Sequence, residues 1–240
     1  MKLLEEMSWP GIEAGLKQTQ TVILPIGATE EHGPHLPIFT DTIQAVEVAK
    51  AAALKRDVFV APPVHYGVCR STRGFPGTIT VSHDALRLYA HDILLSFNDS
   101  GFWRVMILTG HAGGQHLSAL EEACQMAASE RDFLVSMVSL FDLIDPQAVE
   151  AKGDGHAGEI ETSFMMQIRS DLVKGKPAAH FPVRPRFLEL KDVRHLMGNG
   201  IMGDPTRASP EKGKLFMEMA VEGVLKALDE LESFSKKSED

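Results

Sequence analysis

Short apolar runs alternate along the chain with longer segments in which apolar residues recur every three or four positions. The short runs predict buried strands at residues 22–26, 58–61, 105–109 and 134–140. The longer segments predict helices at residues 41–53, 83–98, 114–129, 159–168 and 210–234. This alternation predicts an α/β fold, a three-layer sandwich in which a mainly parallel sheet is flanked by helices.

The composition narrows the class of protein. The 240 residues carry 24 basic and 33 acidic side chains, a net charge of −9, which argues against a nucleic-acid-binding protein. No apolar run is long enough for a membrane span, and the N-terminal segment does not resemble a secretory signal. Two cysteines fit a reducing compartment, so we expect one cytoplasmic domain over residues 1–240, frayed at 236–240.

The first group of candidate chemistry follows the predicted strand at 22–26. Residues two apart in an extended segment point the same way, so Glu30 and His32 can face one point. Asp41, at the start of the next helix, can fold back toward them. Mixed nitrogen and oxygen donors of this kind suit zinc or manganese. A polar loop with Asp41 as a helix cap is the alternative interpretation.

The second group lies at the end of the predicted strand at 105–109. Small residues there allow a sharp turn into a helix and leave His111 facing the crevice at the carboxyl end of the sheet. The segment lacks the glycine and lysine pattern of a nucleotide-binding loop. His116 is interpreted as a residue on the helix surface, with a supporting role behind His111 as the alternative.

The third group surrounds the start of the predicted helix at 159–168. Glu161 would face inward one turn into this helix, and His156 stands just before it. A histidine beside a metal-bound carboxylate is a candidate proton carrier. Glu159 better fits an acidic residue at a helix N-terminus, where the helix dipole favours it. Cys69 is interpreted as a buried structural thiol, because nothing in the sequence indicates a lowered pKa.

Together these groups resemble the creatininase family. The segments that carry the resemblance are LPIGATEEHGPHLPIFTDT, FPGTITV, LTGHAGGQ, DGHAGEIETS and GIMGDPTRASPEKG, in family order from Trp9 to about Gly213. The resemblance implies hydrolysis of non-peptide C–N bonds at a centre of two divalent cations, with zinc or manganese expected and iron as an alternative. It also implies a parallel-sheet α/β sandwich and a homohexamer that acts on a small-molecule substrate.

The resemblance also implies roles for individual residues. Glu30, His32 and Asp41 match the first metal motif, and Asp41 corresponds to the carboxylate that bridges both metals. His111 matches the histidine of the second motif, and His156 matches the histidine proposed as the general acid and base.

One ligand position departs from creatininase itself, which has a glutamate two residues after the second-motif histidine, where this chain has Gly113. Glu161 is the candidate for the remaining carboxylate ligand, with Glu159 as the less favoured alternative. Gly113 would instead leave room for substrate.

Other departures concern the substrate. Creatininase packs its substrate with tryptophans before the third motif, where this chain has none, so we do not expect creatinine to be the substrate. Arg70 and Arg73 replace an acidic-histidine region and could hold a phosphate or carboxylate, or else face solvent or a neighbouring subunit. The family also contains formamidopyrimidine-nucleotide deformylases and a branch that cleaves the peptide precursor of mycofactocin.

The sequence therefore predicts a metal-dependent amidohydrolase. A water molecule between two cations that share Asp41 would attack the substrate carbonyl, and His156 would protonate the leaving nitrogen. The alternative is a catalytically silent member of the family that binds a ligand or supports an assembly, an interpretation suggested by Gly113. A mycofactocin-type peptidase is a further alternative.

Overall fold

The computed structural model describes residues 1–183, 188, 190, 191 and 193–234. Five parallel strands, in the order β1-β3-β2-β4-β5, form its sheet. They are β1 (Lys2–Leu3), β2 (Thr21–Ile26), β3 (Phe59–Val60), β4 (Arg104–Thr109) and β5 (Leu134–Ser139). The fold class predicted from the sequence is confirmed.

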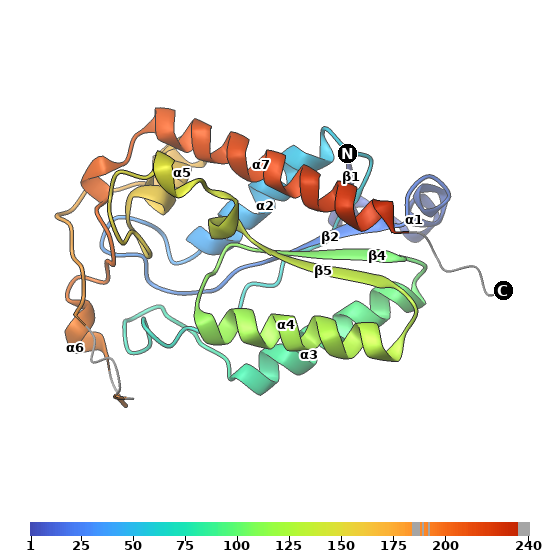
Figure 1. Ribbon diagram of the computed structural model, residues 1–240, viewed down its shortest axis with the longest axis horizontal. Helices are drawn as coiled ribbons and strands as arrows, with labels where there is room; N and C mark the ends of the chain where they lie inside the picture. Colours follow the sequence, from blue (N-terminus) through green and yellow to red (C-terminus); the bar gives the residue numbers. More distant parts are fainter. Residues whose placement is uncertain (184–187, 189, 192, 235–240) are drawn as a thin grey trace.

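Helices cover both faces of this sheet (Figure 1). They are α1 (Trp9–Leu16), α2 (Thr40–Ala53), α3 (His83–Asp99), α4 (Gly114–Glu130), α5 (Glu159–Ile168), α6 (Arg194–Met197) and α7 (Pro210–Ser233). Short 3-10 turns occupy Leu4–Glu6, Leu140–Leu143, Pro146–Ala148, Ser170–Leu172 and Pro205–Arg207. Figure 1 places α2, α5 and α7 on one face of the sheet and α3 and α4 on the other.

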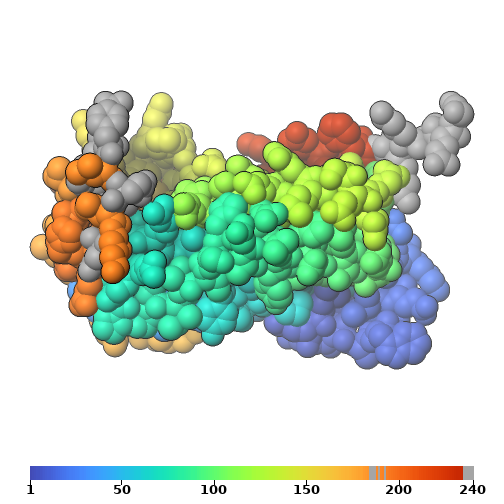
Figure 2. All heavy atoms as spheres, turned by 90° about the horizontal axis from the view of Figure 1, so that it is seen from below, coloured from blue at the N-terminus to red at the C-terminus, as the bar shows by residue number. Residues whose placement is uncertain are grey.

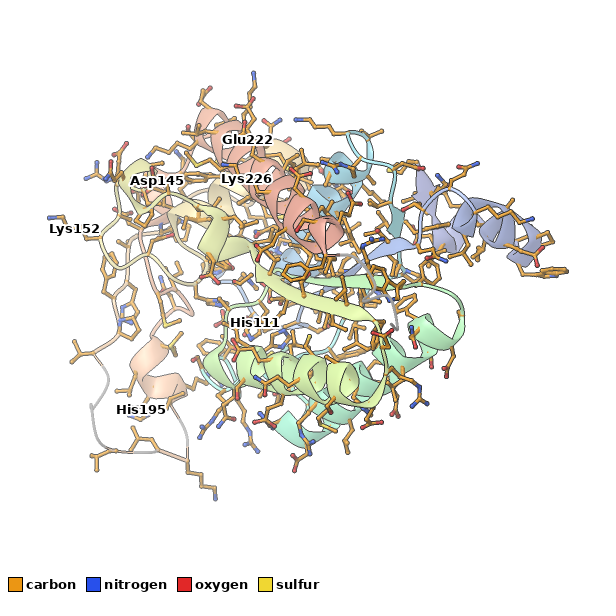
Figure 3. The ribbon with its side chains drawn as sticks, turned by 45° about the vertical axis from the view of Figure 1, so that its right-hand side comes forward. His111, Asp145, Lys152, His195, Glu222 and Lys226 are labelled. Atoms are coloured by element: carbon orange, nitrogen blue, oxygen red, sulfur yellow. The ribbon has the colours of Figure 1, made fainter. Side chains whose placement is uncertain are left out.

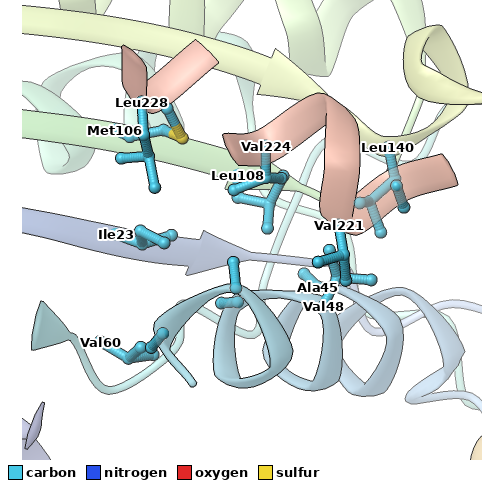
Figure 4. Close-up of a cluster of buried hydrophobic side chains, with 14 of the residues drawn as sticks. Ile23, Ala45, Val48, Val60, Met106, Leu108, Leu140, Val221, Val224 and Leu228 are labelled. Atoms are coloured by element: carbon cyan, nitrogen blue, oxygen red, sulfur yellow. The ribbon is translucent and has the colours of Figure 1, made fainter. Parts of the chain in front are cut away.

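Alternate residues of the central strands supply the two cores. Ile23, Met106 and Leu108 face α2 and α7, in a cluster that Figure 4 shows between the sheet and these helices. Their neighbours Leu24 and Ile107 pack on the other face, against α3 and α4. Helices cover both sides of a parallel sheet, so both of its faces are apolar. The sequence of each central strand is therefore a continuous hydrophobic run.

The helices on the second face form one side of the molecule. Figure 2 shows α3 and α4 across the middle of this side, between the N-terminal segment that contains α1 and the segment around α6. Ser82 accepts a hydrogen bond from the backbone N–H of Ala85 and so caps α3, as predicted.

The central strands bring two loops together. Ile26 at the end of β2 lies in register with Thr109 at the end of β4. Since the strands are parallel, the segments that follow them emerge at the same edge of the sheet. The two segments contain Glu30 and His32 after β2 and His111 after β4, so the topology alone brings the first two sequence groups together.

The predicted long elements are observed within a few residues of their expected bounds. The sequence analysis missed β1, α1 and the single turn of α6, all short elements with little apolar periodicity.

No helix among the described residues combines the length and the apolar character that a bilayer crossing requires. The expected fraying at 236–240 lies outside the described residues.

The packing of α7 predicts its contribution to stability. Leu228 is completely buried between α7 and the sheet, so Leu228→Ala should lower the free energy of unfolding by about 2–5 kcal/mol. Leu215 on the same helix is 41% exposed, and Leu215→Ala should change it by no more than about 0.5 kcal/mol. Urea denaturation of both variants tests this expectation, and similar losses for the two would contradict the packing described.

Candidate metal centre

Close backbone contact fixes the position of Asp41. Gly110, directly after β4, lies against the first turn of α2, and a Cβ atom there would be 2.1 Å from the backbone oxygen of Asp41. A glycine at this position therefore lets the end of β4 and the start of α2 touch. Asp41 is not the cap of α2, because Phe39 occupies that position; its carboxylate is buried in the first turn and faces the loops.

One side of the site contains Glu30, Asp41 and His111. His111 Nδ1 lies 2.8 Å from Glu30 Oε1 and 3.2 Å from Asp41 Oδ2. The other ring nitrogen, Nε2, lies 3.1 Å from the backbone oxygen of Val68. A proton on Nε2 that is donated to this carbonyl leaves the Nδ1 lone pair directed at the two carboxylates.

The other side contains His32, Asp41 and Glu161. His32 Nε2 lies 2.8 Å from Asp41 Oδ1 and 3.4 Å from Glu161 Oε1. Its Nδ1 lies 3.1 Å from the backbone oxygen of Glu30 and can donate to it. Asp41 thus directs one carboxylate oxygen to each side, the arrangement expected of a group shared by two cations.

These distances fit a cation on each side. Two ligand atoms bound to zinc at about 2.1 Å in tetrahedral geometry lie roughly 3.4 Å apart. Glu30 Oε1 and Asp41 Oδ2 are buried and, despite their proximity to His111, make no hydrogen bond. Among the described residues, the ion-pair partners of Glu30, Asp41 and Glu161 are histidines, so the opposite charge that these buried carboxylates need is present only when the imidazoles are protonated.

The pKa values reflect the same crowding. Burial alone would lower the pKa of His32, but the carboxylates of Asp41 and Glu161 outweigh burial and hold it well above its ordinary value. Burial alone would raise the pKa of Glu30, but the imidazoles of His111 and His156 hold it well below its ordinary value. Protons on the imidazoles thus supply positive charge that a divalent cation would supply instead when bound.

His156 stands at the edge of both groups. Its Nε2 lies 2.7 Å from the backbone oxygen of Glu31, and its Nδ1 lies 3.8 Å from Glu30 Oε1. The Nε2 proton is therefore engaged by a carbonyl, and Nδ1 is the nitrogen that faces the site. Burial lowers the pKa of His156 and so does the charge on His32, but Glu30 and the contact with Glu31 raise it, with a net increase.

The carboxylates of Glu161 and Glu159 have different surroundings in the structure. Glu161 Oε2 accepts the backbone N–H of Ala157, which leaves Oε1 beside His32. Glu159 points away from the site and accepts the backbone N–H groups of residues 150 and 151 and a hydrogen bond from Lys212. Glu159 lies in the first turn of α5, as expected, but its complete burial and its ion pair to α7 were not predicted. The ion pair was invisible in the sequence because its two partners are 53 residues apart.

The interpretation of His116 as a residue on the helix surface was wrong. His116 is completely buried, and its Nδ1 accepts the backbone N–H of Val68 at 3.3 Å. Its Nε2 donates to Thr109 Oγ1 at 3.1 Å, and the same oxygen accepts the backbone N–H of His111. His116 therefore supports the turn that carries His111, the alternative left open by the sequence.

A cavity of about 420 Å³ opens onto the site. Glu30, His111, His156 and Glu161 line it, and so do Arg70 and Gly113, whose substrate-binding roles stay predictions. In Figure 3, His111 lies where β4 ends and α4 begins. Arg73 is exposed and is not among the lining residues, so a substrate-binding role there has no geometric support.

Sequence reasoning missed several supporting residues. The hydroxyl of Thr72 donates to Glu30 Oε2, which leaves Oε1 directed into the site. Asp154 accepts the backbone N–H groups of residues 159 and 160 and so holds the start of α5. Ala157, between them, is in the left-handed region at φ 51°, a strained conformation whose N–H reaches Glu161. The DGHAGE segment gave the signal, but only the backbone geometry assigns these roles.

Comparison with protein families gives a match over most of the chain. The family model described as creatininase, creatinine amidohydrolase, matches residues 5–228. A mycofactocin precursor peptide peptidase from Mycolicibacterium smegmatis is 36% identical over 215 residues, which cover 82% of this chain and 80% of that protein. A creatinine amidohydrolase from Pseudomonas putida is 28% identical over 94% of this chain and 95% of its own.

Solved structures give the same result. A creatininase structure described as the manganese form superposes with a TM-score of 0.86 at 26% identity, covering 95% of this chain and 97% of that one. A variant creatininase of the Zn-Zn type gives a TM-score of 0.85 at 27% identity with the same coverage. Structures of this family thus contain manganese or zinc.

His116 predicts a specific pH dependence of stability. Burial and the charge on His111 lower the pKa of His116 to about 3, below the value of about 6.5 in an unfolded chain. The unfolded state therefore binds this proton first, and stability is retained above about pH 6.5 and lost as the pH falls toward 3.

Urea denaturation of metal-free protein between pH 6 and 4 tests this expectation. The wild type should lose about 1 kcal/mol more per pH unit than His116→Gln, which lacks the titrating ring. Parallel pH profiles for the two proteins would show that His116 is not held neutral in the fold.

Proposed function

The chain belongs to the creatininase family, and we propose that it hydrolyses an amide C–N bond at a centre of two divalent cations. Glu30, Asp41 and His111 would hold one cation, and His32, Asp41 and Glu161 the other. Zinc and manganese suit this mixture of oxygen and nitrogen donors, with iron as an alternative.

One observation carries the proposal: Asp41 directs Oδ1 to His32 and Oδ2 to His111, each within 3.2 Å, inside a buried cluster of carboxylates. A polar loop without a ligand would satisfy both oxygens with well-aligned hydrogen-bond donors, yet Oδ2 has only the ring of His111, at 3.2 Å and without hydrogen-bond geometry. The backbone carbonyls that engage the outer nitrogen of each imidazole favour the tautomers that metal ligation requires.

The proposed chemistry divides between the cations and the chain. When bound, divalent cations supply an activated water nucleophile and polarise the amide carbonyl. His156 moves the proton: Nε2 stays on the carbonyl of Glu31, and Nδ1 gives its proton to the leaving nitrogen, which is a poor leaving group as an anion. The buried carboxylates that raise the pKa of His156 favour the protonated form that this step needs.

We place peptide amides ahead of creatinine as candidate substrates. The relative at 36% identity is named for a peptide precursor, and the tryptophans of the creatininase pocket are absent here. Phe141, Val193 and Met202 line the cavity and suit an apolar group beside the scissile amide. Formamides and phosphorylated formamidopyrimidines are the second class, which Arg70 at the cavity wall would suit. A homohexamer and a cytoplasmic location stay predictions.

Variants of Asp41 and His156 test the division of roles. Asp41→Asn should lose both tightly bound metal and hydrolysis, because both cations would share this carboxylate. His156→Gln should keep the metal and lose a factor of about 100 or more in kcat. His83→Gln, at a half-buried histidine at the start of α3, is the matched control and should keep both.

The measurements are elemental analysis of protein purified without chelator and turnover of a panel of short peptides, formamides and cyclic amides. Full metal content with no turnover of any panel member would favour the silent, ligand-binding alternative. Full activity of His156→Gln would remove the proton-transfer role.

The two glutamates of α5 provide a second test. Glu161→Gln removes a proposed ligand and should lower the metal content, with the fold retained. Glu159→Gln breaks the buried pair with Lys212 and should lower the free energy of unfolding by about 3 kcal/mol while the metal content stays at the wild-type level. Metal analysis and urea denaturation of both variants measure the two effects. Metal loss confined to Glu159→Gln would show that Glu159, and not Glu161, is the ligand.

A further inference from the structure

Cys69 is a buried group that the proposed reaction does not use. Its side chain is 1% exposed, and its sulfur lies within 4.8 Å of a ligand atom of Glu30 and of one of His111. From this placement, which rests on the proposed metal centre, we infer that the Cys69 sulfur is a ligand of the cation on the Glu30 and His111 side.

The segment that carries Cys69 is fixed by the same contacts that orient His111. The backbone oxygen of Val68 lies 3.1 Å from His111 Nε2, and the backbone N–H of Cys69 donates to Thr80 Oγ1 at 2.9 Å. The sulfur itself makes a long contact of 3.8 Å with the backbone oxygen of Gly67. The thiol is thus held beside the site by its backbone, with the carboxylate of Glu30 as its neighbour. Burial and the charges of Glu30 and Asp41 raise its pKa, so the thiol proton would leave only when a cation binds.

The neighbouring carboxylates point to a ligand at the same place. Glu30 Oε1 and Asp41 Oδ2 are buried without a hydrogen-bond partner, and both lie within 3.2 Å of His111 Nδ1. A cation among these atoms would take three ligands from Glu30, Asp41 and His111. Zinc in proteins takes four ligands, so one place remains, which the sulfur would fill. The water of the proposed reaction would then be activated at the cation held by His32, Asp41 and Glu161, which has three protein ligands.

Position 113 cannot supply this ligand with His111 as it is placed. A Cβ atom on Gly113 would lie 2.5 Å from His111 Nε2 and 3.2 Å from the backbone oxygen of Val68, across the hydrogen bond that orients the ring. The carboxylate that creatininase has at this position is therefore excluded here. Glu161 already takes the place of that carboxylate in the proposed centre, so a thiolate from Cys69 would be a fourth anionic group, beside Glu30, Asp41 and Glu161, around the two dications.

The inference has a consequence for the choice of metal. Thiolate is a softer ligand than carboxylate and favours zinc or cobalt over manganese. We therefore expect this side of the centre to select zinc, and Cys69→Ser to shift the ratio of zinc to manganese affinity toward manganese by about 10-fold or more.

Cobalt substitution tests the ligand directly. Full-length protein, freed of metal and reloaded with Co²⁺ under reducing conditions, should show a sulfur-to-cobalt charge-transfer band in the near ultraviolet. Cys69→Ser should lose this band, and Cys124→Ser should keep it, because Cys124 lies on α4 among apolar residues. The same band in Cys69→Ser as in the wild type would overturn the inference, as would its absence from the loaded wild type.

A measurement on the unchanged protein covers the case in which Cys69→Ser does not fold. X-ray absorption at the zinc edge of the wild type should contain a sulfur scatterer at about 2.3 Å, and a shell of nitrogen and oxygen alone would overturn the inference.

The variant Asp41→Asn distinguishes a failure of the proposed metal centre from a failure of the proposed Cys69 ligand. If that variant still binds both equivalents of cobalt, the metal centre itself is wrong. If Asp41→Asn loses cobalt while Cys69→Ser keeps the wild-type spectrum, the proposed metal centre stands and only the assignment of Cys69 as a ligand is wrong.

Discussion

Carboxylates buried beside one another are the constraint on which the rest of the structure depends. Glu30, Asp41 and Glu161 are each at most 3% exposed, and an ionised carboxylate removed from water costs several kcal/mol unless opposite charge compensates it. Protons on the imidazoles of His32 and His111 supply this charge without a metal, because the carboxylates raise their pKa values. Divalent cations would supply it instead when bound, and the same buried carboxylates would then serve as the ligands of a catalytic centre.

The fold makes this arrangement possible through its backbone. Parallel strands β2 and β4 deliver their loops to one edge, and Gly110 lets α2 approach close enough to bring Asp41 between them. Backbone carbonyls then set both imidazoles, since Glu30 engages Nδ1 of His32 and Val68 engages Nε2 of His111. The lone pairs that face the site are therefore defined by main-chain geometry, which is rigid, rather than by mobile side chains.

Periodicity and topology made much of the fold and of the site predictable from the sequence. Glu30 and His32 could be brought together with His111 because the ends of neighbouring parallel strands share an edge. Contacts between distant segments could not be predicted: Glu159 pairs with Lys212 on α7, and His116 is buried although it lies in the first turn of an otherwise amphipathic helix. Cys69 could be predicted to be buried, but its neighbours depend on how a loop without regular structure folds over His111.

Anomalous diffraction from crystals of protein purified without chelator tests the central claim most directly. With data on either side of the zinc and manganese edges, the account predicts two peaks, one among Glu30, Asp41 and His111 and one among His32, Asp41 and Glu161. Fully ordered side chains at these positions with no anomalous peak between them, after zinc or manganese has been supplied in excess, would contradict it.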